Sequence, residues 1–158
     1  MYQKFIAELC EFFKCEIKDL KKFLFCPFNR SKLCKKYRNT VLRTTYRNRC
    51  KNHHIFRFAG LSLQDTKHCK AYNSFLGISV LQHFYARHRI LVKNFNLPCV
   101  LEITPQGDSK YYPIELLEIY DEEERIQDDY KQRVSYKPFI NSENNNTVSL
   151  NCVCKYFI

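Results

Sequence analysis

The stretch from 83 to 103, HFYARHRILVKNFNLPCVLEI, places histidines, basic residues and aromatic residues at spacings that suit binding. His83 and Arg87 are four residues apart, so on a helix their side chains lie one above the other. His88 follows on the flank of the same surface. A neutral imidazole donates one N–H to a phosphate, and an imidazolium donates two with a charge. The spacing places these three side chains on one helix surface; histidines that merely face solvent are the simplest interpretation.

Motifs of common enzymes are not found in the sequence. It contains no G-x-S-x-G, no H-E-x-x-H and no glycine-rich phosphate loop. Its carboxylates cluster at 115–129, whereas a two-metal nuclease needs carboxylates spread around a pocket. We therefore expect a protein that is not an enzyme, with no catalytic residue and no cofactor.

The nine cysteines are an odd number, and no signal-peptide pattern precedes them. We expect most of them to be reduced thiols in a cytosolic or nuclear protein. Cys152 and Cys154 alternate with apolar residues, which favours one face of a strand over a metal site. We expect no metal. No apolar run is long enough to span a membrane, so no membrane partner is expected.

The net charge of +10 is unevenly distributed along the chain. Residues 1–93 hold 20 Lys/Arg and 5 Asp/Glu, whereas residues 94–158 hold 6 Lys/Arg and 11 Asp/Glu. No acidic residue lies between Asp19 and Asp65. A field of one sign attracts polyanions, because each neutralised phosphate releases counterions. Basic residues that alternate with Tyr, Phe and His favour a nucleic-acid partner over a solvated basic face.

The elements expected to position these residues are short. Apolar residues recur with a helical period over 2–24, which predicts one leading helix that stops before Pro27. The segments 39–47 and 53–58 are rich in β-branched and aromatic residues and predict a hairpin. The segment 61–75 reads as a loop with one short strand at 71–75. Ser79 and Gln82 form a capping-box pattern at the start of a second helix.

Two further strands are expected at 98–104 and 109–120, joined by the turn sequence PQGD. The segment 121–134 is acidic and suggests a short helix, and 148–158 alternates as a last strand. The expected fold class is α+β: a small barrel with a leading helix and an inserted helix. The expected divisions are a leading helix at 1–27, the barrel domain at 28–120, and an acidic segment with a C-terminal strand at 121–158.

Three short motifs, taken in order, resemble the PAZ domain of Argonaute and Piwi proteins. They are His83-Phe84 on a helix, the link Leu97-Pro98-Cys99, and Tyr112-Pro113-Ile114-Glu115. The resemblance covers roughly residues 5 to 120. It implies an oligonucleotide-binding-like barrel with an inserted strand-and-helix clamp, which holds the 3′ end of a small RNA. This agrees with the way cationic grooves and stacking aromatic residues hold single strands.

The resemblance implies roles for eight residues. Phe56 stands where the family has a phosphate-contacting tyrosine, so a packing role is an equal alternative, and Arg57 matches the arginine that follows it. Tyr72 falls near a clamp aromatic residue. The remaining RNA-binding residues implied are His54 and Arg87 at basic positions, His83 and His88 at tyrosine positions, and Tyr112 at the pocket floor.

The function expected from this resemblance is binding of the 3′ end of small single-stranded RNA, or of a 3′ overhang, in RNA silencing. Other silencing proteins are possible further partners. A PAZ-like scaffold for protein contacts, with a degenerate RNA pocket, is the alternative. Because a bound anion favours the imidazolium form, the histidines at 83 and 88 also predict that RNA affinity grows as the pH falls toward about 6.

Overall fold

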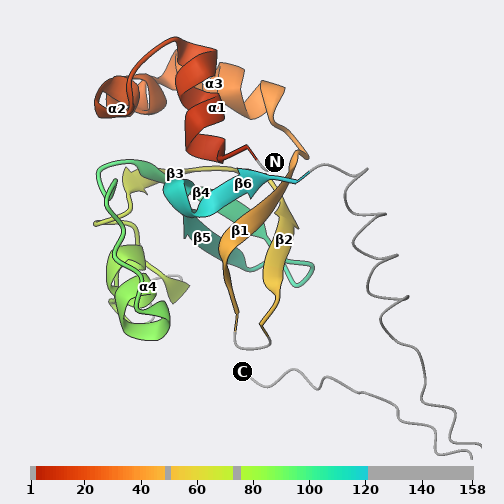
Figure 1. Ribbon diagram of the computed structural model, residues 1–158, viewed down its shortest axis with the longest axis vertical. Helices are drawn as coiled ribbons and strands as arrows, with labels where there is room; N and C mark the ends of the chain where they lie inside the picture. The colour runs from red at the N-terminus through yellow and green to blue at the C-terminus, as the bar shows by residue number, and fades with distance from the viewer. Residues whose placement is uncertain (1–2, 49–50, 73–75, 121–158) are drawn as a thin grey trace, which may run out of the picture.

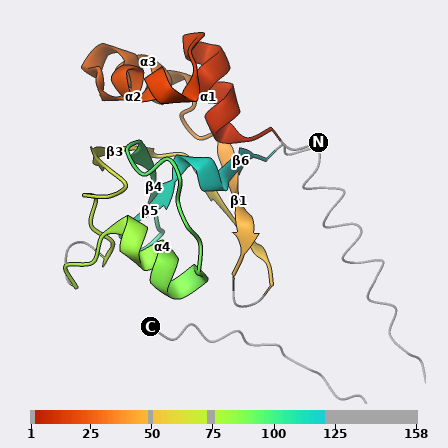
Figure 2. The same cartoon turned by 60° about the vertical axis from the view of Figure 1, so that its left-hand side comes forward.

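The computed structural model of this protein describes residues 3–48, 51–72 and 76–120. Helices α1, α2 and α3 lie together at one end, the strands form the middle, and α4 lies at the other end (Figure 1). The turned view agrees with this arrangement (Figure 2). The elements predicted within 121–158, with Cys152 and Cys154, lie outside the described residues. No helix in the described ranges is long and apolar enough to cross a membrane.

The prediction of one leading helix over 2–24 is wrong in one respect, because the structure has two helices there. α1 (Phe5–Phe13) ends where Lys14 takes the left-handed conformation, with φ of 50°. The N–H of Lys14 donates to the carbonyls of Cys10 and Glu11, which closes the helix end. The chain then turns and α2 (Ile17–Phe25) begins. The apolar period continues through this turn, so periodicity alone does not reveal the break.

A third helix, α3 (Pro27–Lys36), was not predicted. Pro27 occupies its first turn, where the missing N–H has no intrahelical partner in any case. Arg30 ties this helix to the strands below, because its guanidinium donates to the carbonyls of Leu61 and Ser62 at 2.9 Å each. The helical end of the molecule is therefore attached to the sheet by polar contacts as well as by its apolar face.

The strands form two three-stranded antiparallel sheets, so the α+β prediction is confirmed, although the sheets are not closed into a barrel. The first sheet has the order β2 (His53–Arg57), β1 (Val41–Arg47), β6 (Leu117–Ile119). The second has the order β3 (Gly60–Asp65), β4 (Pro98–Ile103), β5 (Ser109–Pro113). The predicted hairpin of β1 and β2 is confirmed by the pair Leu42–Phe56.

The strand predicted over 109–120 is divided between the two sheets. β5 ends at Pro113, whose ring nitrogen has no proton for a further ladder bond. A short 3₁₀ helix, η2 (Ile114–Leu116), follows, and β6 then pairs with β1. This crossing joins the two sheets around a shared core, in which Phe5, Phe58 and Phe84 are the largest fully buried side chains.

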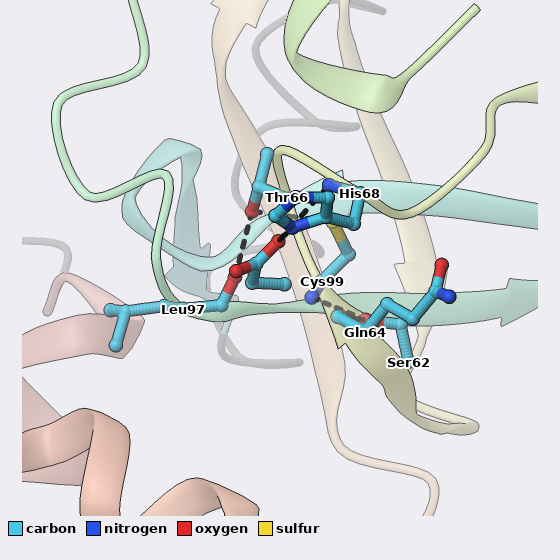
Figure 3. A network of polar contacts seen from close by, with 7 residues as sticks. Ser62, Gln64, Thr66, His68, Leu97 and Cys99 are labelled. Carbon is cyan, nitrogen blue, oxygen red and sulfur yellow. Dashed lines mark hydrogen bonds and ion pairs between the residues drawn. The ribbon is translucent and has the colours of Figure 1, made fainter.

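β3 was missed in the sequence because its pairing with β4 is irregular. The register shifts between Leu61 and Asp65, so the alternation of side chains is interrupted. Side chains replace ladder bonds there (Figure 3): the N–H of Cys99 donates to Ser62 Oγ at 2.8 Å, and Thr66 Oγ1 donates to the Leu97 carbonyl at 2.9 Å. The network fixes the point at which the chain leaves the sheet toward α4.

The predicted strand at 71–75 is not found in its described part. Lys70 forms an isolated bridge with Ser79, and Ala71 donates its N–H to the Ile78 carbonyl at 2.9 Å. Residues 73–75 lie outside the description. The segment after β3 is thus held alongside the start of α4 by isolated backbone hydrogen bonds rather than by a continuous ladder.

The predicted helix start at Ser79 is confirmed. Ser79 Oγ accepts the N–H of Gln82 at 3.2 Å, and Gln82 Oε1 accepts the N–H of Ser79 at 2.9 Å. This capping box begins α4 (Val80–His88), which buries Val80 and Phe84. A helix anchored at its first turn and along one face presents its other residues in fixed positions.

Candidate nucleic-acid interface

A pocket of about 620 Å³ opens between α4, the end of β1, and β5. This volume lies within the range typical of ligand sites. The residues that line it are Tyr46, Asn48, His54, Ala71, Tyr72, His83, Phe84, Arg87, His88, Asp108, Ser109, Lys110, Tyr111 and Tyr112. α4, which supplies four of these residues, lies at the end of the molecule away from α1–α3 (Figures 1 and 2).

Six of the eight predicted RNA-binding residues line this pocket, and two do not. Successive residues on a strand point to opposite faces, and β2 separates the predicted neighbours Phe56 and Arg57 in this way. Phe56 is only 5% exposed and belongs to the core, which supports the packing alternative. Arg57 is exposed on the other face, where its guanidinium donates to the Asn39 carbonyl at 3.3 Å. The structure therefore brings neither of them to the pocket.

A buried carboxylate holds the floor of the pocket. Glu102, on β4, accepts hydrogen bonds from Tyr112 Oη at 2.8 Å and from His54 Nε2 at 3.0 Å. Burial disfavours ionisation of Glu102, but the hydrogen bonds from His54 and Tyr112 outweigh it and lower the pKa below its usual value. The carboxylate is thus charged at neutral pH, and both lining side chains are fixed by it.

Two lining residues, His54 and Tyr112, also pack on the buried ring of Phe56, which lies behind the pocket floor. The rings of Phe56 and Tyr112 are nearly parallel, with centroids 4.6 Å apart, and His54 stacks on Phe56 at 5.5 Å. Burial, followed by the charge of Glu102, raises the pKa of Tyr112. Its phenol therefore stays protonated and continues to donate to Glu102. His54 and Tyr112 thus present aromatic rings to the pocket while His54 Nε2 and Tyr112 Oη are engaged by Glu102.

The α4 wall carries the two histidines. His83 Nδ1 lies 2.8 Å from Tyr72 Oη, and the ring of His88 lies 4.8 Å from that of Tyr46. The two imidazole centroids are 5.7 Å apart. Burial, together with the nearby His88 and Arg87, lowers the pKa of His83, so this imidazole is neutral at neutral pH. Arg87 stands exposed at the rim.

Several lining residues were not predicted. Tyr46 follows Leu42 and Thr44 on the inward face of β1, and alternation along the strand is the signal that could have found it. Asp108 ends the turn between β4 and β5, and Ser109 and Lys110 begin β5; the turn sequence indicates only a turn. Their approach to α4 depends on how the two sheets pack, which no local pattern encodes.

The pocket has the chemical features of a single-strand site. Arg87 and Lys110 supply positive charge, and Asp108 opposes it locally. Burial and then the charge of Glu102 raise the pKa of Tyr46, so this phenol also stays a neutral donor. Within the described residues, no group of three His, Cys, Asp or Glu side chains could hold a metal ion. Aromatic faces, hydrogen-bond donors and cations together suit nucleobases and phosphates.

This arrangement of sheets and inserted helix is the fold of PAZ domains. A crystal structure of a Drosophila Argonaute PAZ domain in complex with 3′-end 2′-O-methylated RNA superposes with a TM-score of 0.61 and 20% identity. The match covers 77% of this chain and 100% of that one. The fold class predicted from the sequence is thereby confirmed.

Two structures of the Drosophila Argonaute 2 PAZ domain give the same result. One, described for 3′-end recognition of nucleic acids, has a TM-score of 0.57 and 21% identity over 77% of this chain and 97% of that one. The other, described for structure and nucleic-acid binding, has a TM-score of 0.57 and 19% identity over 75% and 99%. No protein-family model matches the sequence, and no curated protein matches it.

Proposed function

We propose that this protein binds the 3′ end of small single-stranded RNA, or of a 3′ overhang, as a PAZ module in RNA silencing. The observation that carries this proposal is the pocket itself. It gathers His54, Tyr72, His83, Arg87 and His88 from three separate parts of the chain around one aromatic floor. A strand end enters such a pocket more readily than a continuous duplex does, because its last bases are unstacked.

The chemistry of the lining supports this assignment. Stacking of a base on an aromatic side chain contributes about 1–3 kcal/mol, irrespective of the base. The tyrosine and histidine side chains supply hydrogen-bond donors for backbone phosphates, and Arg87 and Lys110 supply charge. A site of this kind recognises an end and a backbone rather than a sequence.

The comparisons lend further support. The Drosophila Argonaute PAZ domain with the same fold is in complex with the 3′ end of a 2′-O-methylated RNA. For the present chain we infer a binding role without catalysis, in the cytoplasm or in ribonucleoprotein granules, alongside other silencing proteins. In this proposal the segment 28–120 is the binding domain.

The test is fluorescence polarisation with a 5′-dye RNA of about ten nucleotides, a length within the usual range for single-strand sites. An RNA with a free 3′ hydroxyl is compared with the same RNA carrying a 3′ phosphate. We expect the free end to bind better, and the His83→Ala/His88→Ala double variant to lose that preference.

The matched control is His68→Ala. His68 is hydrogen-bonded to Asp65 and does not line the pocket, so this variant should retain the preference. Equal affinity for the 3′-hydroxyl and 3′-phosphate RNAs, unchanged by the double substitution, would contradict the proposal. The protein would then be better regarded as a basic scaffold for protein contacts.

A further inference from the structure

Tyr72 and His83 form a pair across the wall of the pocket. Tyr72 Oη lies 2.8 Å from His83 Nδ1, and the two rings meet edge to face, with centroids 5.0 Å apart. Tyr72 belongs to the segment after β3, whereas His83 belongs to α4. The hydrogen bond therefore fixes the orientation of the imidazole from outside its own helix.

The protonation state of His83 decides which atom donates in this pair. Burial and the neighbouring His88 and Arg87 lower the pKa of His83, so the free protein holds a neutral ring. A neutral imidazole has one N–H and one acceptor nitrogen. When Tyr72 Oη donates to Nδ1, the proton of the ring must be on Nε2. The opposite tautomer would present a bare Nε2 lone pair, which repels a phosphate oxygen.

The other charged and titratable groups around the pocket come from several elements. They are Arg87 and His88 on α4, Tyr72 before it, Tyr46 on β1, His54 on β2, Asp108 before β5, and Lys110 and Tyr111 on β5. Glu102 lies behind His54 and is engaged by His54 and Tyr112. In the free protein, burial and the neighbouring His88 and Arg87 disfavour the charged form of His83 and lower its pKa. A bound phosphate adds negative charge at this place and reverses that balance.

We propose, on the basis of the proposed function, that Tyr72 is a positioning residue for His83. It holds the ring with Nε2–H as the donor to a phosphate of the bound RNA, and binding takes up a proton from solvent at Nδ1. The Tyr72 hydroxyl then turns and accepts the new Nδ1–H, so the pair persists in both protonation states. His83 therefore becomes a charged donor only in the complex with the phosphate.

The direction of the pH effect follows from this cycle. The pKa of His83 is lowered in the free protein, and a bound phosphate raises it in the complex. The complex therefore binds more protons than the free protein between these two values. RNA affinity rises as the pH falls through the pKa of the complex, and it levels off below the pKa of the free protein.

The first experiment needs no RNA. Nitrogen-15 NMR of the histidine rings reports the tautomer of His83 in the free protein at about pH 8, where the ring is neutral. We expect Nε2–H in the wild type and a mixed population in Tyr72→Phe. The control is Tyr85→Phe: Tyr85 is on the same helix, is 53% exposed and does not line the pocket. An Nδ1–H wild type, or a Tyr72→Phe variant with an unchanged tautomer, overturns the inference.

The second experiment measures proton uptake by calorimetric titration of the RNA in buffers of different ionisation enthalpy, near pH 7. We expect uptake in the wild type, its loss in His83→Gln, and its retention in His68→Gln. If the RNA binds but no proton uptake is seen, or if the uptake persists in His83→Gln, the inference is overturned and the proposed function stands. A complete lack of RNA binding at every pH defeats the proposed function, and this inference with it.

Discussion

Glu102 is the residue on which the pocket floor depends. It is a carboxylate from a central strand, and its two partners, His54 and Tyr112, both face the pocket. A buried charge is tolerated only when hydrogen bonds replace its lost hydration. Here the replacement comes from residues that also line the pocket, so the stability of the floor and its shape are linked.

Substitution Glu102→Gln should lower the free energy of unfolding by about 2 kcal/mol at neutral pH, because charged hydrogen bonds are lost. The pKa of Glu102 is lowered in the fold from its ordinary value of 4.5. Its contribution is therefore full above that value and is lost as the pH falls through the folded pKa. Urea unfolding should show a difference between wild type and variant at about pH 7 that shrinks as the pH is lowered below 4.5.

The control is Glu16→Gln, on a side chain that is 73% exposed. This variant should unfold like the wild type at both pH values, since exposed ion pairs contribute little. A Glu102 variant with a pH-independent deficit would mean that the carboxylate form is not what stabilises the floor.

At the scale of elements, two local devices decide where α4 lies. The capping box of Ser79 and Gln82 begins the helix. Beyond its end, the Glu115 carboxylate accepts the backbone N–H groups of Lys93 at 2.6 Å and of Asn94 at 2.9 Å. Asn94 also donates its side-chain amide to Glu115. One device orients the first turn of α4 and the other holds the link from α4 to β4.

Substitution Ser79→Ala should lower the free energy of unfolding by about 1 kcal/mol, because the N–H of Gln82 loses its acceptor. RNA affinity should fall as well, since His83 and Arg87 are carried by this helix. Thermal unfolding and polarisation binding measure the two effects. The comparison variant is Ser31→Ala on the exposed face of α3, which should be neutral or slightly stabilising. Equal unfolding of both variants would contradict a capping role for Ser79.

Substitution Glu115→Gln should lower the free energy of unfolding by about 1.5–3 kcal/mol, because an amide cannot accept hydrogen bonds from two N–H groups as strongly as a carboxylate does. The amide exchange of Lys93 and Asn94, followed by hydrogen–deuterium exchange, should accelerate most. Exchange that increases evenly over the whole domain would mean that Glu115 stabilises the fold generally rather than this link.

At the scale of the whole molecule, Lys and Arg outnumber Asp and Glu among the residues that the structure describes. Two of these basic residues, Arg87 and Lys110, line the pocket. RNA affinity should therefore fall steeply between about 50 mM and about 200 mM salt. Arg87→Gln should reduce the slope of log affinity against log salt by about one, because one phosphate contact is lost. Arg89→Gln, just beyond α4 and not lining the pocket, should leave the slope unchanged. Salt-independent binding would instead indicate an apolar protein interface.

Local sequence patterns determined much of the fold and of the candidate site. The capping box at Ser79 predicted the start of α4, and alternating β-branched and aromatic residues predicted β1, β2 and β4. These signals succeed because their physical cause lies within a few residues. His83, Arg87 and His88 could be placed on one wall for the same reason, since helical spacing alone brings them together.

Only the tertiary structure decided the rest. The apolar period of 2–24 continues across the turn at Lys14, and the strand-like run of 109–120 passes from one sheet to the other after Pro113. β2 turns Phe56 into the core and Arg57 away from the pocket. Tyr46, Glu102 and Lys110 meet the site only because two sheets pack against each other. Such contacts join residues far apart in the chain, and their free energy depends on packing that no short stretch of sequence contains.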